Sequence, residues 1–336
     1  MLQQTRIIHT IDAHTGGEPL RIVTTGMPPV PGANMLAKRA WLKAERDDLR
    51  CFLIHEPRGH ADMYGAYLLP PVSADADFGV IFLHNEGYSD MCGHGIIALG
   101  KVLVELEFVK RTMPETRIGF DTPAGFIEAW VAWDGQRAGQ VRFHNVPAFI
   151  YQRDVEVVTP SFGRLVGDIV FGGAFYYYIN VVQSGLQVQP QQLRALIQLG
   201  AESKAALQAS TPVRHPLEPR LDQLYGTIID GVPQRPGADQ TNVCIFAERE
   251  VDRSPTGTGT SGRVAQLFLR GRLGLQQPYV NDSIIGSRFT ARVIGTTRVG
   301  EFDAALTEVA GHAHIMGMNQ WLLEDSDPFP RGFFLR

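Results

Sequence analysis

The sequence predicts an α+β protein built of two similar lobes, each with one helix at its centre. Short apolar runs of strand length, separated by Gly and Pro, fill most of the 336-residue chain. Two longer segments instead carry apolar residues at three- and four-residue steps, the pattern of a helix with a wide apolar face. Both segments begin with a glycine-rich motif, about half a chain apart, which points to two lobes of the same design.

The first half of the chain is β-rich. Its runs of strand length are bounded by turn residues and lie at 6–14, 20–26, 50–56, 78–84, 117–123, 125–133 and 140–146. One stretch differs, because from Cys92 onward the apolar residues recur at helical spacing: Ile96, Ile97, Leu99, Val102, Leu103 and Leu106. We expect this stretch to form a central helix inside a sheet.

The strand pattern begins again after residue 150. A strand region is expected at 168–182, a surface helix at 189–207, and strands at 224–230 and 242–249. A second central helix is expected after Pro255, carrying the apolar residues Val264, Ala265, Leu267, Phe268 and Leu269. We therefore place the lobe boundary near residue 160, with 1–160 in the first lobe and 161–314 in the second.

Composition excludes several classes of function. Apolar residues make up 44% of the chain and charged residues 20%, with a net charge of -4, which suits a globular protein that binds neither nucleic acid nor membrane. The first apolar run is broken by Arg6, His9 and Asp12, so no signal peptide or membrane span is expected there. Three cysteines are too few, and odd in number, for a disulfide framework, and we expect a reducing, cytoplasmic compartment.

The starts of the two central helices align with each other. Cys92-Gly93-His94-Gly95 opens one, and the segment 256–259, Thr-Gly-Thr-Gly, opens the other. A helix N-terminus offers unpaired N–H groups and a partial positive charge, and glycines let a small anion approach that backbone closely. Two such starts facing each other across a cleft between the lobes would hold one carboxylate from both sides.

The spacing G-x-G-x-x-G at 257–262 also invites a nucleotide-binding interpretation, which fits poorly. A dinucleotide fingerprint follows its strand directly and opens a βαβ unit, whereas 252–256 intervene here and only a short chain follows. A phosphate-binding P-loop ends in Gly-Lys-Ser/Thr, but this motif ends in Gly262-Arg263-Val264. We expect neither nucleotide.

No metal site is expected either. The motif at 55–60 is one residue too long for H-E-x-x-H, and Pro57 and Gly59 would interrupt the helix that such a site needs. Cys92, His94 and His14 are possible ligands, but glycines at a helix start suit an anion better. The segment 14–18 either borders the pocket or is only a turn around its two glycines.

Cys92 is the candidate nucleophile or base. A helix N-terminus lowers the pKa of a cysteine thiol from about 8.5 into a range of about 3.5 to 7.5, and the resulting thiolate can take a proton. Cys51 and Cys244 are flanked by apolar residues in predicted strands, so we interpret them as small buried hydrophobic side chains. The aromatic residues of 171–178 are interpreted as strand core.

Four motifs together resemble the proline racemase family. They are MCGHG at 91–95, DRSPTGTGTSG at 252–262, HTGGEPLRIV at 14–23 and DIVFGGAFY at 168–176, and they span nearly the whole chain in the family's order. The resemblance implies a diaminopimelate-epimerase-like fold, in which each lobe is a curved, mostly antiparallel sheet around a central helix and the C-terminal residues from about 315 to 336 return to the first lobe. It also implies catalysis without a cofactor or metal, a site between the lobes, and a homodimer.

This chain departs from the family pattern at Thr256. The family's racemases and epimerases have a second cysteine there, which delivers a proton to the opposite face of Cα. A threonine hydroxyl is a poor proton donor to carbon, so two-base inversion loses one partner. A branch of the family that resembles the racemases but has Thr at this position removes water from trans-3-hydroxy-L-proline. That reaction needs one base on one ring face, and Cys92 suffices.

The resemblance also assigns roles to the neighbouring residues. The N–H groups of the helix starts would bind the substrate carboxylate: Gly93, His94, Gly257 and Thr258. Asp252 matches the family acid that meets the ring nitrogen, or else it is a polar residue before a helix. His94 contacts the ring nitrogen or caps its helix, and Thr256 is either an N-cap or a hydrogen-bond partner of the substrate.

Three functions stay open at this point. A dehydratase acting on a hydroxyproline-like imino acid explains Cys92 and Thr256 best. A proline racemase or 4-hydroxyproline epimerase would need a second acid that the motifs do not reveal. A protein that binds an amino acid without catalysis would need the glycines but not the thiol of Cys92.

Overall fold

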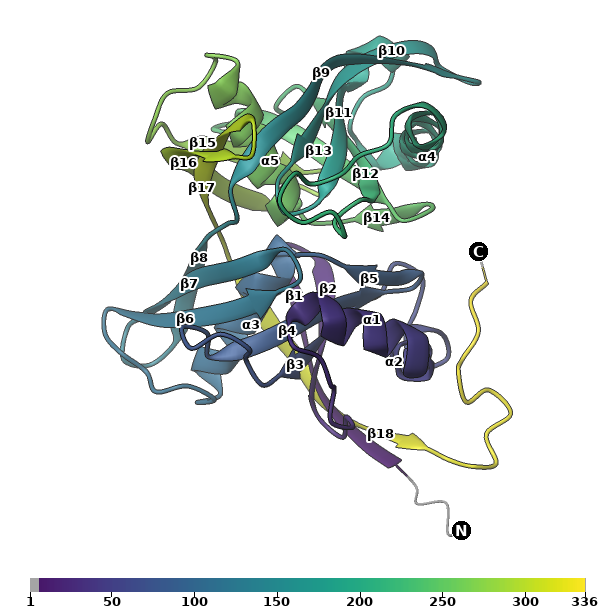
Figure 1. Ribbon diagram of the computed structural model, residues 1–336, viewed down its shortest axis with the longest axis vertical. Coiled ribbons are helices and arrows are strands. Elements are labelled where there is room, and N and C mark those ends of the chain that lie inside the picture. Colours follow the sequence, from purple (N-terminus) through teal and green to yellow (C-terminus); the bar gives the residue numbers. More distant parts are fainter. Residues whose placement is uncertain (1–5, 336) are drawn as a thin grey trace. The chain divides into compact units, whose positions relative to one another are not determined.

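The computed structural model describes residues 6–335, and the chain divides into two compact units (Figure 1). Among the described residues, the first unit comprises 6–91, 95–141 and 312–335. The second comprises Cys92–His94 and Arg142–Gly311. The short segment that carries Cys92 is therefore part of the second unit.

The first unit is a curved sheet with helices packed on it. Its strands are β1 (Arg6–Thr15), β2 (Glu18–Thr25), β3 (Tyr64–Leu69), β4 (Phe78–His84), β5 (Gly87–Ser89), β6 (Glu115–Thr122), β7 (Gly125–Trp133) and β18 (Ala313–Leu323), with β8 (Ala138–His144) crossing the boundary. Pairing runs in the order β18, β1, β2, β3, β4, β6, β7, and β5 pairs with the other end of β4. The pairs β2–β3 and β4–β6 are parallel, and the others are antiparallel.

Helix α3 (Gly93–Glu105) is the central helix predicted from the apolar spacing. Its apolar residues from Ile96 to Val104 are almost completely buried. Gly100 lies so close to β7 and β8 that an added Cβ would be 2.9 Å from a methyl of Val141 and 3.1 Å from one of Val131. A glycine is therefore needed where this helix touches its sheet.

Two helices of the first unit correct the expected pattern. Residues 50–56, predicted as a strand, lie mainly in α2 (Asp47–Ile54), which follows α1 (Met35–Glu45). All residues from Leu49 to Ile54 are buried, and a short, continuous apolar run cannot be assigned to strand or helix by its period. Asp47 and Asp48 in the first turn, where acidic side chains favour a helix, were the available signal.

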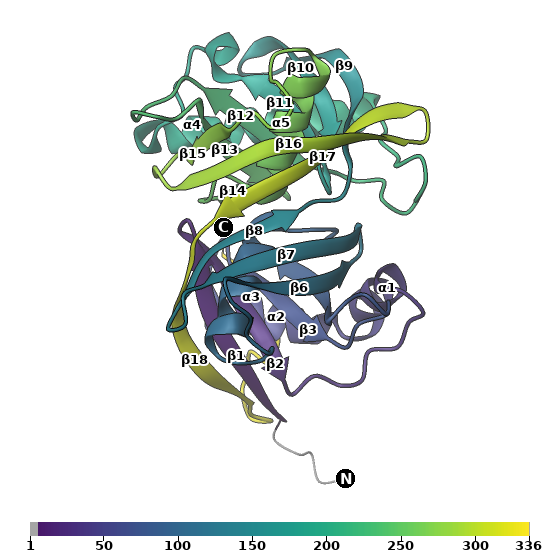
Figure 2. The same ribbon diagram turned by 90° about the vertical axis from the view of Figure 1, so that its left-hand side faces the viewer.

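The sheet of the second unit closes on itself. Its strands are β9 (Ala148–Thr159), β10 (Gly163–Phe171), β11 (Phe175–Asn180), β12 (Leu224–Gly231), β13 (Gln240–Phe246), β14 (Glu250–Asp252), β15 (Tyr279–Ser283), β16 (Arg288–Val299) and β17 (Phe302–Gly311). Pairing runs from β9 through β10, β11, β12, β13, β15, β16 and β17 back to β9. Figure 2 shows β16 and β17 as a long hairpin of this ring. The predicted strand region 168–182 is the hairpin β10–β11, turning at Gly172–Ala174.

Helix α5 (Gly257–Leu269) lies within this ring and contacts β9, β10, β16 and β17. It is the predicted second central helix. Helix α4 (Leu193–Ser210) packs against β9, β12 and β13 and buries one face, after the short 3-10 helices η1 (Val181–Ser184) and η2 (Pro190–Gln192). An α+β protein with a curved, mostly antiparallel sheet around a helix is therefore confirmed. No helix within residues 6–335 is both long enough and apolar enough to cross a membrane.

Candidate active site

Cys92 and His94 lie together at the start of α3. The Sγ of Cys92 is 3.1 Å from Nδ1 of the His94 ring and 3.8 Å from its Nε2. Both residues are almost fully buried, with 5% and 3% of their surface exposed. The thiol therefore has an imidazole within hydrogen-bond distance, an arrangement in which a proton can pass between the two groups.

The starts of α3 and α5 are in direct backbone contact within the second unit. A Cβ added to Gly93 would lie 2.6 Å from Cα of Gly257, and one added to Gly257 would lie 2.5 Å from Cα of Gly93. Only glycine at both positions permits this approach. Since the first-turn N–H groups of a helix have no carbonyl one turn earlier, two sets of such donors meet here. The predicted alignment of the two glycine-rich motifs thus corresponds to a physical contact.

Thr256 precedes the first residue of α5 and has an unusual backbone. Its φ is 61° and its ψ is 103°, a region that a β-branched residue rarely adopts. Its side chain makes no capping hydrogen bond. Its Oγ1 is buried and has no hydrogen-bond partner among the described residues. The side chain of Thr256 therefore does not act as an ordinary N-cap of α5.

Asp252 is tied to the same loop. It lies in β14, is 5% exposed, and its Oδ1 accepts a hydrogen bond of 2.8 Å from the N–H of Ser254. The hydroxyl oxygen of Ser254 in turn accepts one of 3.0 Å from the N–H of Thr256. A buried carboxylate thus stands two hydrogen bonds away from Thr256.

Two tyrosines of the predicted aromatic core fix the first turn of α5. The Tyr176 hydroxyl is 2.7 Å from Oγ1 of Thr258, and the Tyr178 hydroxyl donates a hydrogen bond of 2.8 Å to the carbonyl of Gly259. Burial raises the pKa of both phenols well above their ordinary value, so they remain protonated. The sequence did not indicate this role, because both tyrosines lie in an apolar strand and were interpreted as core residues.

The remaining glycines of 257–262 serve packing. A Cβ on Gly262 would lie 2.2 Å from the hydroxyl oxygen of Tyr178, and a Cβ on Gly259 would lie 2.7 Å from a methyl of Ile228. On the facing hairpin, a Cβ on Gly172 would lie 2.5 Å from the carbonyl oxygen of Thr258. The spacing G-x-G-x-x-G therefore reflects close contacts of α5 with its surroundings.

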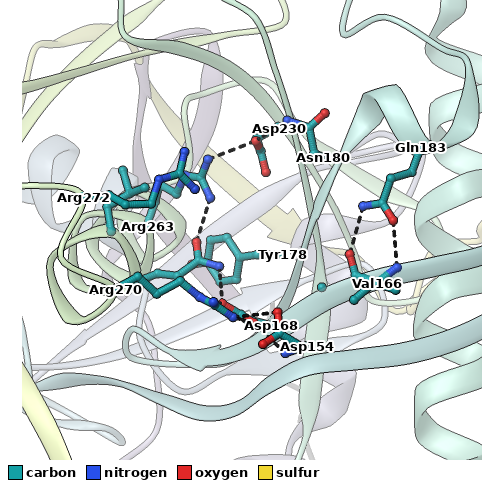
Figure 3. Close-up of a pocket in the computed structure, with 13 residues that line it drawn as sticks. Asp154, Val166, Asp168, Tyr178, Asn180, Gln183, Asp230, Arg263, Arg270 and Arg272 are labelled. Atoms are coloured by element: carbon teal, nitrogen blue, oxygen red, sulfur yellow. Dashed lines mark hydrogen bonds and ion pairs between the residues drawn. The ribbon is translucent and has the colours of Figure 1, made fainter.

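A polar cavity of about 250 Å³ lies at the C-terminal half of α5 (Figure 3). Asp168 accepts hydrogen bonds of 2.6 and 2.8 Å from Arg270 and one of 2.7 Å from Gln266. Asp230 forms a 3.0 Å ion pair with Arg263. Burial would raise the pKa of Asp168, but its hydrogen bonds to Arg270 and Gln266 outweigh this and keep that pKa below its usual value. These pairs join α5 to β10 and β12.

The predicted segment 14–18 lies in the first unit. His14 and Glu18 lie on either side of the turn between β1 and β2 in the first unit, where Gly16 and Gly17 have φ of 59° and 90°. The two glycines therefore serve the turn. Within residues 6–335, no three His, Cys, Asp or Glu side chains are grouped so that they could hold a metal ion.

None of the three cysteines forms a disulfide, and all three are buried. Cys51 lies in α2 rather than in the strand predicted for it, while Cys244 lies in β13 as expected. Burial raises the pKa of the Cys51 thiol, which keeps it protonated and unreactive. Both residues fit their interpretation as small buried side chains.

Comparison with known proteins gives consistent matches over almost the full length. The family model described as proline racemase matches residues 10–334. A trans-3-hydroxy-L-proline dehydratase from Azospirillum brasilense is 56% identical over 99% of both chains. A 3-hydroxyproline 2-epimerase from Burkholderia multivorans is 55% identical, again over 99% of both chains. The crystal structure of a hydroxyproline epimerase from Agrobacterium vitis, with bound trans-4-hydroxy-L-proline, superimposes with a TM-score of 0.93 at 30% identity, covering 98% of this chain and 96% of the other.

Proposed function

Because the chain belongs to the proline racemase family, we propose that it is a hydro-lyase that removes water from trans-3-hydroxy-L-proline without a cofactor. The name of the 56% identical relative supports this activity. The main support for the proposal is the pair of side chains at the two helix starts, which are in contact. One carries the thiol of Cys92 and the other the hydroxyl of Thr256. This pair contains a single group suited to take a proton from carbon.

The stereochemistry of the substrate suits one base. In trans-3-hydroxy-L-proline the hydroxyl lies opposite the carboxylate, and hence on the same ring face as the hydrogen on Cα. The Cys92 thiolate takes that proton, the Cα–H electron pair forms the Cα=Cβ bond, and the Cβ–O bond breaks. The hydroxyl takes up a proton and leaves as water, and the resulting enamine tautomerises to Δ1-pyrroline-2-carboxylate. No proton needs to arrive from the opposite face, which agrees with a threonine at 256.

The helix starts bind and stabilise the substrate carboxylate. Negative charge spreads onto this group as the proton leaves Cα, and preorganised N–H donors stabilise the charge as it develops. The proposed donors are the backbone N–H groups of Gly93, His94, Gly257 and Thr258. Their contact across Gly93 and Gly257 supports a shared carboxylate site.

Asp252 and His94 complete the proposed site. The Asp252 carboxylate meets the ring nitrogen, whose positive charge makes the Cα hydrogen more acidic. The imidazole of His94, 3.1 Å from the Cys92 sulfur, can exchange a proton with the thiol. Either the newly protonated Cys92 or His94 supplies the proton to the leaving hydroxyl.

An epimerase is the second candidate, because the 55% identical relative from Burkholderia multivorans is named a 3-hydroxyproline 2-epimerase. Inversion at Cα requires a proton donor on the ring face opposite Cys92. The Thr256 hydroxyl is a poor proton donor to carbon. Dehydration therefore fits the side chains at the helix starts better.

One assay separates these functions. The protein is incubated in D2O with trans-3-hydroxy-L-proline, trans-4-hydroxy-L-proline or L-proline, following pyrroline with o-aminobenzaldehyde and deuterium at Cα by NMR. We expect pyrroline from the first substrate alone. Inverted, deuterated product from any of the three substrates would favour the epimerase or racemase. No reaction with any of them would favour a protein that binds an amino acid without catalysis.

The partner and the compartment of this enzyme are also proposals. Its substrate is a hydroxyproline-like imino acid, and we expect it to work as a homodimer in the cytoplasm. The absence of a disulfide among the three cysteines supports a reducing compartment. Light scattering coupled to gel filtration measures the mass in solution, and a monomer would contradict the expected dimer.

A further inference from the structure

The carbonyl group of Pro255 receives an unusual number of side-chain hydrogen bonds. The side-chain amides of Asn242 and Asn281 donate to its oxygen at 3.0 and 3.2 Å, and the Thr260 hydroxyl donates at 2.9 Å. The Asn281 amide also donates to the Thr260 hydroxyl at 2.8 Å. A carbonyl has two lone pairs, so three donors over-determine the orientation of this one peptide group.

These donors come from separate parts of the second unit. Asn242 lies in β13, Asn281 in β15 and Thr260 in the first turn of α5. All three residues are essentially inaccessible to solvent, at 1%, 0% and 0% exposure. Each amide must turn its NH2 group toward the Pro255 carbonyl, because turning its Oδ1 there would bring two acceptor oxygens together. Their geometry is therefore fixed by the Pro255 carbonyl.

The peptide that they hold leads into the strained residue Thr256. A backbone in this region is strained and persists only where the surroundings enforce it. Three hydrogen bonds on the preceding carbonyl together contribute free energy of the same order as such strain, and so can offset it. The Ser254 hydroxyl oxygen, which accepts the Thr256 N–H, holds the other side of the same peptide.

The strained conformation changes what the Thr256 hydroxyl can do. A threonine with an ordinary N-cap backbone turns its hydroxyl back to a first-turn N–H of its own helix. Thr256 does not, and its Oγ1 stays buried without a partner among residues 6–335. The backbone thus forgoes a capping hydrogen bond and leaves both the hydroxyl and the helix-start N–H groups open to a ligand.

We propose that Asn242 and Asn281 are positioning residues, which hold the Pro255–Thr256 peptide so that the Thr256 hydroxyl bonds to the substrate carboxylate, the substituent on the ring face opposite Cys92, and does not cap α5. This inference rests on the proposed dehydratase function. Neither amide touches the substrate. Each acts through Thr256, and together they keep its hydroxyl directed at the bound substrate.

The test replaces each amide by leucine, which is similar in size and has no polar atom. The Oδ1 atoms of Asn242 and Asn281 are both buried without a partner among the described residues. Leucine therefore removes a donor and also an unsatisfied acceptor, and because the other donors to the Pro255 carbonyl remain, the midpoint of urea unfolding should change little. The kcat for dehydration should fall about tenfold in each variant. If the two asparagines had a purely structural role, the unfolding midpoint would fall and kcat would stay the same.

Asn85 provides the matched control. It is a buried asparagine of the first unit whose side chain is fully used, accepting from Met63 and donating to the carbonyls of Ile54 and His60. Asn85→Leu should lower the unfolding midpoint and leave kcat per folded molecule unchanged. If Asn242→Leu and Asn281→Leu behave like this control, the positioning role is wrong.

A double-mutant cycle with Thr256→Val tests whether the amides act through Thr256. Adding Asn242→Leu to Thr256→Val should cause no further loss of kcat. An equal tenfold loss in both backgrounds would overturn the proposal. If the wild-type protein forms no pyrroline at all, the proposed function fails, and the inference is judged by a second measurement that needs no substrate.

That measurement uses the variant Thr256→Cys combined with Cys92→Ser. The pH midpoint of alkylation by iodoacetamide reports the environment of the thiol introduced at position 256. Adding Asn242→Leu should release this side chain to accept a helix-start N–H, which stabilises the thiolate and shifts the midpoint to lower pH. An unchanged midpoint would mean that the amide does not hold this residue.

Discussion

The contact between the two helix starts gives a sharp prediction for Gly93→Ala. The new Cβ would lie 2.6 and 2.8 Å from Cα and C of Gly257 and 2.9 Å from Cζ of Phe143. Ordinary contacts of a Cβ begin at 3.4 Å. Because two of the three atoms are backbone, the helix starts must separate by several tenths of an ångström, up to nearly 1 Å.

Such a separation should damage catalysis more than folding. A misplacement of about 1 Å in a site can cost about 100-fold in rate, and loss of one preorganised donor costs about 10²–10³. We expect kcat/KM for trans-3-hydroxy-L-proline to fall about 100-fold, equivalent to about 2.7 kcal/mol of transition-state stabilisation. Overpacking should lower the free energy of unfolding by about 1–3 kcal/mol.

The assay is steady-state pyrroline formation, paired with urea unfolding of the same preparation. Gly257→Ala should give the same loss, because its Cβ enters the same gap from the other side. Gly317→Ala in β18 is the control, since no atom lies within 4 Å of its added Cβ and its φ is not positive. If both helix-start variants keep kcat/KM within threefold of the wild type, close approach of these backbones is not required for catalysis.

Three further predictions follow from the same site and from the ion pairs of α5. Cys92→Ser should lower both pyrroline formation and deuterium exchange at Cα by about 10²–10⁴, with an unchanged circular dichroism spectrum; retained exchange would assign the base elsewhere. Thr256→Cys should confer some inversion of trans-4-hydroxy-L-proline, detected by NMR in D2O, and its complete absence would mean that the second position differs from an epimerase by more than one side chain. Asp168→Asn should lower the free energy of unfolding at pH 7 by about 1.5–3 kcal/mol, because Arg270 is partly exposed and keeps its pair with Asp154. The folded pKa of Asp168 lies below its unfolded value, so its stabilisation is present above the unfolded pKa and is lost as pH falls through the folded one. The difference from wild type in urea should therefore shrink in acid, and a difference independent of pH would exclude the ion pair as its cause.

The sequence predicted the features that depend on neighbours along the chain. Apolar spacing indicated α3 and α5, and the glycines at their starts indicated a close approach of backbone. The aligned motifs at Cys92 and Thr256 then suggested that the two starts belong together, and Gly93 contacts Gly257 in the structure. The strand predicted at 50–56 was wrong, because a short, continuous apolar run cannot be assigned to strand or helix by its period.

The support around Thr256 could not be predicted, because it depends on contacts distant in sequence. Asn281 lies in β15, the first strand after α5, and its link to Pro255 exists only after β15 has paired with β13. Asn242 gave one weak signal, a polar side chain inside an apolar strand, which requires a buried partner. Tyr178 gave none, since buried tyrosines are common in strands.

The backbone of Thr256 is best explained by function. A chain selected for stability alone would place glycine at a φ of 61°, or would let a threonine cap α5 and gain about 1 kcal/mol. Here the threonine is kept, its backbone is strained, and its hydroxyl forms no hydrogen bond with the described residues. Buried hydrogen bonds to the preceding carbonyl hold this arrangement in place. Local strain compensated by its surroundings is characteristic of functional sites, and it agrees with the role proposed for Thr256, the residue where the chain departs from the two-cysteine pattern.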